Sequence, residues 1–232
     1  MSESRRQLIR SVKQQVKSLR GFGVSAVPGR VQAARAPSPV TVACASKTEQ
    51  LKQLAANVLA CTRCMLYKTR TNIVISDGSP EAKLVFVGEA PGRDEDLQGV
   101  PFVGRAGQLL TKMIEAMGLK RSQVYICNVL KDRPPENRTP LPEEMEACLP
   151  FLEEQLRIIQ PKVICVLGSV AAKALIGPHV SIMRIRGQRH EYQGIPLIPT
   201  FHPAYLLRNP PAKKEAWEDL KQVMKLLKED AL

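Results

Sequence analysis

The sequence predicts an α/β protein, a three-layer α/β/α sandwich around a central four-stranded parallel sheet. Short apolar runs alternate with amphipathic helical stretches along most of the chain, a pattern typical of a parallel sheet with helices on both faces. Residues 163–168 are apolar throughout, as expected of a parallel strand that is buried on both faces. The expected strands are 84–87, 124–129, 163–168 and 197–201.

Helices are expected between these strands and at both ends of the folded region, where apolar residues recur at helical spacing. Ser169 is a suitable N-cap for a short Ala-rich helix. Gly118 and Gly177 are suitable stops, because glycine is favoured just after a helix. The expected helices are 48–59, 109–117, 143–159, a short one between Ser169 and Gly177, and 212–229.

Charge and composition divide the chain at residue 46. Residues 1–46 carry eight Lys or Arg and one acidic residue, within a net charge of +12 for the whole chain. Residues 4–20 have the spacing of a basic amphipathic helix, and residues 21–46 the composition of a flexible linker. We therefore expect a basic, flexible extension at 1–46, either dispensable or an electrostatic tether, and a folded domain at 47–232. The positive charge favours a nucleic-acid partner.

Membrane and secretory classes are not favoured. No apolar run approaches the roughly 20 residues that span a bilayer, and the N-terminus lacks the continuous apolar core of a secretory signal. We expect a cytoplasmic protein without a membrane association, although the basic start leaves an organellar address open.

Polar residues follow three of the expected strands. A loop with four carboxylates, residues 89–96, follows the first strand, Asn128 ends the second and His202 follows the fourth. Because parallel strands end at one edge of a sheet, these groups are expected to share a crevice. Carboxylates, an amide and an imidazole suit hydrolysis with general acid–base help. Taken singly, each could instead be a solvated or structurally satisfied polar residue.

Four motifs resemble those of the family 4 uracil-DNA glycosylases, which are iron–sulfur members of the uracil-DNA glycosylase superfamily. They are residues 88–92 (Gly-Glu-Ala-Pro-Gly), 101–107, 133–140 and 201–210. The resemblance covers about residues 47–228. It implies a monomeric enzyme that flips uracil out of single- or double-stranded DNA and hydrolyses the N-glycosidic bond, which leaves an abasic site and starts base excision repair.

The resemblance also implies roles for single residues. Phe102 would stack on the flipped base, and the Asn128 amide would pair with uracil O4 and N3–H and reject cytosine. His202 would donate a hydrogen bond to uracil O2 as negative charge develops there. For the carboxylate that stabilises the sugar cation and positions water, Glu95 ranks first and Glu89 second. Further uracil-binding positions are Gly88, Ala90 and Gly92, and Ala90 stands where other families of the superfamily have Asp or Asn. The implied DNA contacts are Arg105, Arg138 and the minor-groove loop Leu206, Leu207 and Arg208.

The chain has six cysteines, and the resemblance implies that some of them hold a 4Fe–4S cluster, which takes four thiolates. Cys61, Cys64 and Cys148 supply three, but Asp132 stands where the family has the fourth cysteine. Asp132 could bind iron through oxygen and give a labile cluster, or the cluster could contain three irons. Alternatively, the site could be occupied differently, for instance with Cys127 as a ligand or with zinc, which accepts mixed Cys and Asp ligands. Cys127 and Cys165 lie in apolar strands and are expected to be buried, and Cys44 is expected to be incidental.

Two other functions remain open. One is a protein that traps uracil-DNA covalently, although members of that type have a histidine in the loop aligned with residues 134–140 and this chain has none. The other is a non-catalytic iron–sulfur DNA-binding module, against which Asn128 and His202 argue. A zinc deaminase is excluded because its H-x-E and P-C-x-x-C motifs are absent.

Overall fold

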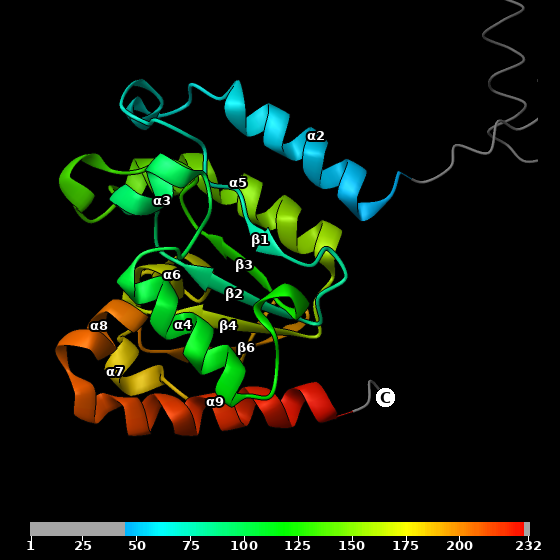
Figure 1. Cartoon of the computed structure of the whole chain (residues 1–232), viewed down its shortest axis with the longest axis vertical. Helices are drawn as coiled ribbons and strands as arrows, with labels where there is room; N and C mark the ends of the chain where they lie inside the picture. The colour runs from blue at the N-terminus through cyan, green and yellow to red at the C-terminus, as the bar shows by residue number, and fades with distance from the viewer. Residues whose placement is uncertain (1–44, 230–232) are drawn as a thin grey trace, which may run out of the picture. The chain divides into compact units, whose positions relative to one another are not determined.

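A six-stranded sheet lies at the centre of residues 45–229, the part of the chain that the computed structural model describes (Figure 1). Its strand order is β1-β3-β2-β4-β6-β5. The four central strands are parallel, and the two edge strands run antiparallel to their neighbours. The strands are β1 (Asp77–Gly78), β2 (Leu84–Gly88), β3 (Tyr125–Asn128), β4 (Val163–Leu167), β5 (His190–Tyr192) and β6 (Ile195–Thr200).

The predicted α/β class and the parallel central sheet are confirmed, and the two edge strands were missed. Both edges are only two or three residues long and carry no apolar run that would mark them in the sequence. The predicted extension lies mostly outside the described residues, together with its helix 4–20 and Cys44. None of the described helices is long and apolar enough to cross a membrane.

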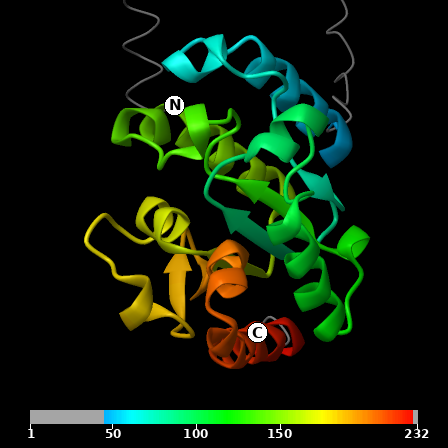
Figure 2. The same ribbon diagram turned by 60° about the vertical axis from the view of Figure 1, so that its left-hand side comes forward.

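Helices cover both faces of the sheet (Figures 1 and 2). Helices α5 (Pro142–Ile159) and α6 (Ser169–Leu175) pack on one face, and α2 (Lys47–Leu59) packs against α5. Helices α4 (Arg105–Ala116) and α9 (Lys213–Lys228) pack on the other. Three short helices in connecting segments were not predicted: α3 (Arg93–Gln98), α7 (Ile182–Ile185) and α8 (Pro203–Arg208).

The central strands are buried on both faces because their side chains alternate between two cores. In β2, Val85 and Val87 contact the core under α5 and α6, whereas Leu84 and Phe86 contact the core under α4 and α9. This period of two is the expected consequence of strand geometry. Apolar residues on both faces explain the unbroken apolar runs in the sequence.

The strand order brings the predicted polar residues to one crevice. The chain passes from β2 to β3 on one side and then returns to β4 on the other side of β2. Ligands of open α/β sheets bind at the carboxyl ends of strands near such a reversal. The segments that follow β2, β3 and β6 therefore converge there.

Candidate active site

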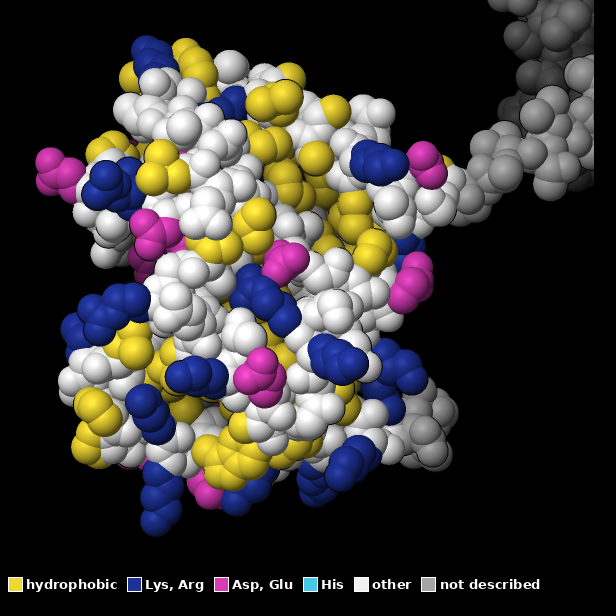
Figure 3. Space-filling model, in the orientation of Figure 1, with side chains coloured by type: hydrophobic (Ala, Val, Ile, Leu, Met, Phe, Trp, Pro, Cys, Tyr) yellow, Lys and Arg dark blue, Asp and Glu magenta, His cyan; other side chains and the backbone are white. Residues whose placement is uncertain are grey.

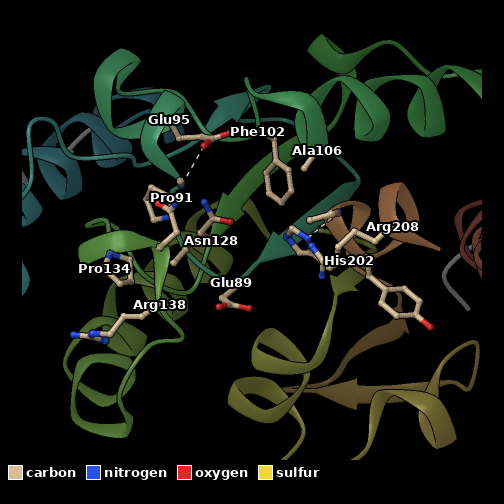
Figure 4. Close-up of a pocket in the computed structure, with 15 residues that line it drawn as sticks. Glu89, Pro91, Glu95, Phe102, Ala106, Asn128, Pro134, Arg138, His202 and Arg208 are labelled. Carbon is tan, nitrogen blue, oxygen red and sulfur yellow. Dashed lines mark hydrogen bonds between the residues drawn. The ribbon is translucent and has the colours of Figure 1, made fainter. Parts of the chain in front are cut away.

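A pocket of about 490 Å³ opens at the carboxyl ends of these strands (Figure 4). Its size is within the usual range of sites for small ligands. All four sequence motifs contribute to the lining, together with Glu95 and Asn128 from outside them. The lining residues are Glu89, Ala90, Pro91, Gly92, Glu95, Phe102, Ala106, Asn128, Pro134, Asn137, Arg138, His202, Ala204, Tyr205 and Arg208. Pro91, Ala106, Pro134, Asn137, Ala204 and Tyr205 were not singled out beforehand. Their membership of the motifs was the signal that could have identified them.

The Glu95 carboxylate holds two loops together. One of its oxygens accepts a hydrogen bond from the Gly92 N–H at 3.1 Å, and the other accepts from the N–H groups of Val103 at 3.0 Å and Gly104 at 3.1 Å. Glu95 lies in the first turn of α3, where a carboxylate that bonds back to the N-cap is favoured. Both oxygens of Glu95 are therefore engaged by the backbone.

The Glu89 side chain differs from that of Glu95 in having no hydrogen bond or ion pair among residues 45–229. Its side chain is half-buried, and burial raises the pKa of its carboxyl above the ordinary value. Figure 4 shows the carboxylate directed into the pocket near Asn128 and His202. This oxygen pair is available to a ligand or a water molecule.

Phe102 forms an apolar wall of the pocket and is only 6% exposed. Its backbone has φ +55°, a left-handed conformation that is costly for a bulky residue. Gly107 permits it, since a Cβ there would lie 1.8 Å from the Phe102 carbonyl oxygen. A Cβ on Gly88 would lie 2.5 Å from the Phe102 ring and 2.4 Å from Asn128 Oδ1. Glycine at position 88 is therefore required for the Phe102 ring and the Asn128 amide to lie as close to the backbone at position 88 as they do.

The Asn128 amide is placed at the end of β3 and is 2% exposed. In the described part of the chain, its Oδ1 is one of two buried side-chain oxygen or nitrogen atoms without a hydrogen-bond partner. Buried polar groups are normally hydrogen-bonded, and each exception calls for an explanation. An acceptor left open at the bottom of a pocket is suited to a ligand that donates a hydrogen bond.

His202 is the N-cap residue of α8, and its Nδ1 accepts a hydrogen bond from the Ala204 N–H at 3.1 Å. In the neutral ring, this leaves the proton on Nε2. Burial, with a smaller contribution from the positive charge of Arg208, lowers the pKa of His202 to about 4. The imidazole is therefore neutral at pH 7, with Nε2–H as a hydrogen-bond donor. Its ring centroid lies 5.6 Å from that of Phe102.

The predicted DNA contacts differ in how accessible they are. Arg105 and Arg208 are exposed, and Leu207 is half-buried. Leu206 is only 1% exposed and packs with Phe201 and Ala216, so its prediction as a groove residue is corrected to a core residue. Figure 3 shows many Lys and Arg side chains over the lower half of the molecule, where Figure 1 places α4, α8 and α9.

Arg138 lines the pocket but is already paired. Its guanidinium donates to both oxygens of Glu144, at 2.5 and 2.8 Å. This forked geometry is the strong form of an Arg–carboxylate contact. Arg138 thus holds the loop after β3 against the start of α5, and less of its charge is free for DNA.

The three candidate cysteine ligands lie near one another, since Cys64 interacts electrostatically with both Cys61 and Cys148. Cys61 and Cys64 follow α2, and Cys148 lies on α5. The thiols of Cys64 and Cys148 accept backbone hydrogen bonds from Leu66 and Lys131, and both interact electrostatically with Asp132. Burial raises the pKa of the Cys64 and Cys148 thiols. Cys127 and Cys165 are completely buried in strands, as expected.

Asp132 forms an ion pair with Arg70. Its carboxylate is 3.1 Å from Arg70 Nη1, and the Asp132 residue is 4% exposed. Arg70 also donates to the carbonyl oxygens of Val58 and Leu59 at the end of α2. No signal in the sequence marked Arg70. Within residues 45–229, no group of three or more His, Cys, Asp or Glu side chains could hold a metal ion.

Comparison with known proteins identifies the family of this chain. The family model of the uracil DNA glycosylase superfamily matches residues 75–221. The type-4 uracil-DNA glycosylase of Thermotoga maritima is 49% identical over 166 residues, which are 71% of this chain and 86% of the relative. The type-4 enzyme of Archaeoglobus fulgidus is 44% identical over 186 residues, 77% of this chain and 94% of the relative. That of Sulfurisphaera tokodaii is 43% identical over 187 residues, 77% and 85%. The chain therefore belongs to the uracil-DNA glycosylase superfamily and, within it, to the type-4 uracil-DNA glycosylases, as the four sequence motifs predicted.

Proposed function

We propose that this protein is a uracil-DNA glycosylase that flips uracil out of DNA and hydrolyses its N-glycosidic bond. The observation that carries the proposal is the open Asn128 Oδ1, which shares one pocket with the neutral His202 donor beside the Phe102 ring. A base must leave the stack to enter such a pocket. The product is an abasic site, and the reaction belongs to the start of base excision repair.

Recognition of uracil is assigned to Asn128 and Phe102. The amide oxygen accepts from N3–H of uracil, and the amide nitrogen donates to O4. Cytosine presents the opposite pattern and would leave buried groups unpaired, which is an effective basis for rejection. The Phe102 ring stacks on the base, and Gly88, Ala90 and Gly92 supply backbone around it.

Cleavage of the bond is assisted by His202. Negative charge develops on the departing uracil, and Nε2–H donates a hydrogen bond to its O2. Because the Nδ1 contact with Ala204 fixes the ring, the donor is in place before charge develops. Preorganised donors of this kind contribute on the order of 10²–10³ in rate.

The carboxylate beside the sugar is assigned to Glu89 in first place. The sequence ranked Glu95 ahead of it, but the oxygens of Glu95 are held by three backbone N–H groups. The Glu89 carboxylate is open to the pocket and suits the stabilisation of positive charge on the sugar and the positioning of water. Glu95 then acts indirectly, by holding the loops that carry Gly92 and Phe102.

A 4Fe–4S cluster is proposed at Cys61, Cys64 and Cys148. A single zinc ion needs all of its ligands within about 2.0–2.3 Å, and no group in residues 45–229 is placed in that way. Cluster thiolates bind different irons and stand further apart, so a cluster fits the cysteines better than zinc does. Backbone N–H groups on two of the thiols suit metal-bound thiolates. The fourth position fits less well, because the Asp132 carboxylate is paired with Arg70. The cluster would link the end of α2 to α5 and has no part in breaking the glycosidic bond.

Contact with DNA is assigned to Arg105, Leu207 and Arg208, with a smaller contribution from Arg138. Leu207 and Arg208 follow His202 on α8, so a wedge at Leu207 would enter the DNA close to the emptied base position. We also expect the protein to act as a cytoplasmic monomer, with residues 1–46 as a basic extension of the catalytic domain at 47–232.

The proposal is tested with oligonucleotides that contain one uracil, in single strands and in duplexes, followed by alkali to cleave abasic sites. Matched oligonucleotides with cytosine or thymine at the same position are the controls. We expect cleavage of the uracil strands alone, without added metal or nucleotide. Uracil strands that stay intact would contradict the proposal, and a protein–DNA complex that survives SDS would instead favour the covalent trap.

A further inference from the structure

Lys131 is a buried cation that the proposed reaction does not use. It follows Asn128 by three residues, and its exposed fraction is 0%. Lysine is almost never fully buried unless its ammonium group is paired. Here Nζ donates to the main-chain oxygen of Asn128 at 2.5 Å and to Gln155 Oε1 at 2.5 Å.

Gln155 continues the network along β3. Its Nε2 donates to the Tyr125 hydroxyl at 2.8 Å and to the Ile75 carbonyl at 3.1 Å. These two acceptors orient the amide so that Oε1 faces Lys131. Tyr125 begins β3 and Asn128 ends it. The network of Lys131, Gln155 and Tyr125 therefore contacts both ends of the strand that carries the uracil-reading amide.

The main chain around Asn128 is also held from the opposite side. The Val129 N–H donates to the Gly88 carbonyl at 2.9 Å, and the Leu130 N–H donates to the Glu89 carbonyl at 3.0 Å. These bonds extend the pairing of β2 and β3 beyond the strand ends. The Lys131 side chain is directed back along the chain, so that Nζ donates to the main-chain oxygen of Asn128. The backbone of Asn128 is thus fixed while Oδ1 remains open to the pocket.

We propose that Lys131 is a positioning residue for uracil recognition, which acts by holding the main chain of Asn128 through its bonds to Asn128 and Gln155. This inference rests on the proposed function. A group that reads a base gains from support by locked neighbours, and a displacement of about 1 Å can cost about 10² in rate. Lys131 does not touch the base itself.

The test is a double-mutant cycle between Lys131→Met and Asn128→Ala. Methionine keeps a long unbranched side chain but cannot donate to either oxygen. In the wild-type background we expect Lys131→Met to lower kcat/KM on uracil DNA by about 10–10². In the Asn128→Ala background the same change should lower it by less than about twofold, because independent sites add and coupled sites do not.

Equal losses in the two backgrounds, or wild-type activity in Lys131→Met, would overturn the inference. If wild-type protein itself leaves uracil DNA intact, the proposed function fails instead, and the two failures are thereby distinguished. Where Lys131→Met does not fold, as judged by circular dichroism, the cycle is run with Gln155→Met, which removes one of the two acceptors of Lys131. The same non-additive pattern is then expected with a smaller loss, and additive losses would overturn the inference.

Tyr125→Phe is the matched control. It removes a hydroxyl from the far end of the network, while the Ile75 carbonyl still accepts from Gln155 Nε2 and both partners of Lys131 Nζ remain. We expect kcat/KM within about twofold of wild type. A loss as large as that of Lys131→Met would show that any disturbance of this core lowers activity, and would count against a specific effect on Asn128.

Discussion

The base pocket and the cysteine group differ in whether their polar side chains are already satisfied within the protein. In the pocket, Asn128 Oδ1 and the Glu89 carboxylate have no hydrogen-bond partner among residues 45–229. In the cysteine group, Asp132 is closely paired with Arg70. The pocket thus offers open acceptors to a ligand at Asn128 and Glu89, whereas the carboxylate of the cysteine group is already used by the protein.

The same distinction separates residues within the pocket. Glu89 lies in the loop after β2 and Glu95 in the first turn of α3, and both line the cavity. Three backbone N–H groups, however, use the oxygens of Glu95. A carboxylate with its acceptors filled contributes to geometry, whereas one that is buried and unpaired is costly and calls for an explanation. Hydrogen-bond satisfaction is therefore a better guide to a chemical role than position in a motif.

The largest effect is expected from His202→Ala. Loss of the donor to uracil O2 should lower kcat by about 10²–10⁴, and Asn128→Ala should lie in the same range. His179→Ala is the control, because His179 is exposed and is not among the residues that line the pocket. Single-turnover cleavage of a uracil oligonucleotide measures the effect. Near-normal turnover of either variant would show that the residue has no part in the mechanism. The comparison between open groups in the pocket and satisfied groups beside the cysteines would then fail.

A smaller but still large effect is expected from Glu89→Gln. Replacing the open carboxylate by an amide of the same shape should lower kcat by about 10² or more, whereas Asp94→Asn, an exposed change on the same loop, should not. Glu95→Gln should lower the melting temperature as well as activity, because it disturbs bonds to Gly92, Val103 and Gly104. If Glu95→Gln lowers kcat more than Glu89→Gln without loss of stability, the carboxylate beside the sugar is Glu95 and not Glu89.

The pH profile should sharpen the assignment of Glu89. Its pKa is raised by burial, so activity should be present above the raised value and fall as the pH drops through it. His202 has a pKa of about 4 and stays neutral above that value, so no limb is expected near 6.5. The profile of kcat/KM should therefore have an acid limb that Glu89→Gln lacks. A limb that persists in Glu89→Gln would assign it to another group.

Much of the fold and the base pocket could be predicted because it depends on local patterns. Apolar runs identified the four central strands, and their parallel arrangement brought Asn128 and His202 together. Contacts between distant segments could not be predicted. The Arg70–Asp132 pair joins residues 62 positions apart, and Glu95 reaches backbone groups whose place depends on the left-handed turn at Phe102. The burial of Leu206 depends on how α8 packs near Ala216.

The smallest effect on activity is expected from Asp132→Cys, which tests the cysteine group directly. The change supplies the missing fourth thiolate, so a cluster should lose its visible absorbance and iron more slowly in air than in wild type, while kcat changes by less than about twofold. Asp132→Ala is the control. It leaves the half-buried Arg70 without its carboxylate, a loss of at most about 3–5 kcal/mol, the range for a fully buried pair, and should lower the melting temperature by several degrees. Iron retention that is the same in wild type and Asp132→Cys would place Asp132 away from the cluster. Asp132 would then act through its ion pair with Arg70, which joins the end of α2 to the segment after β3.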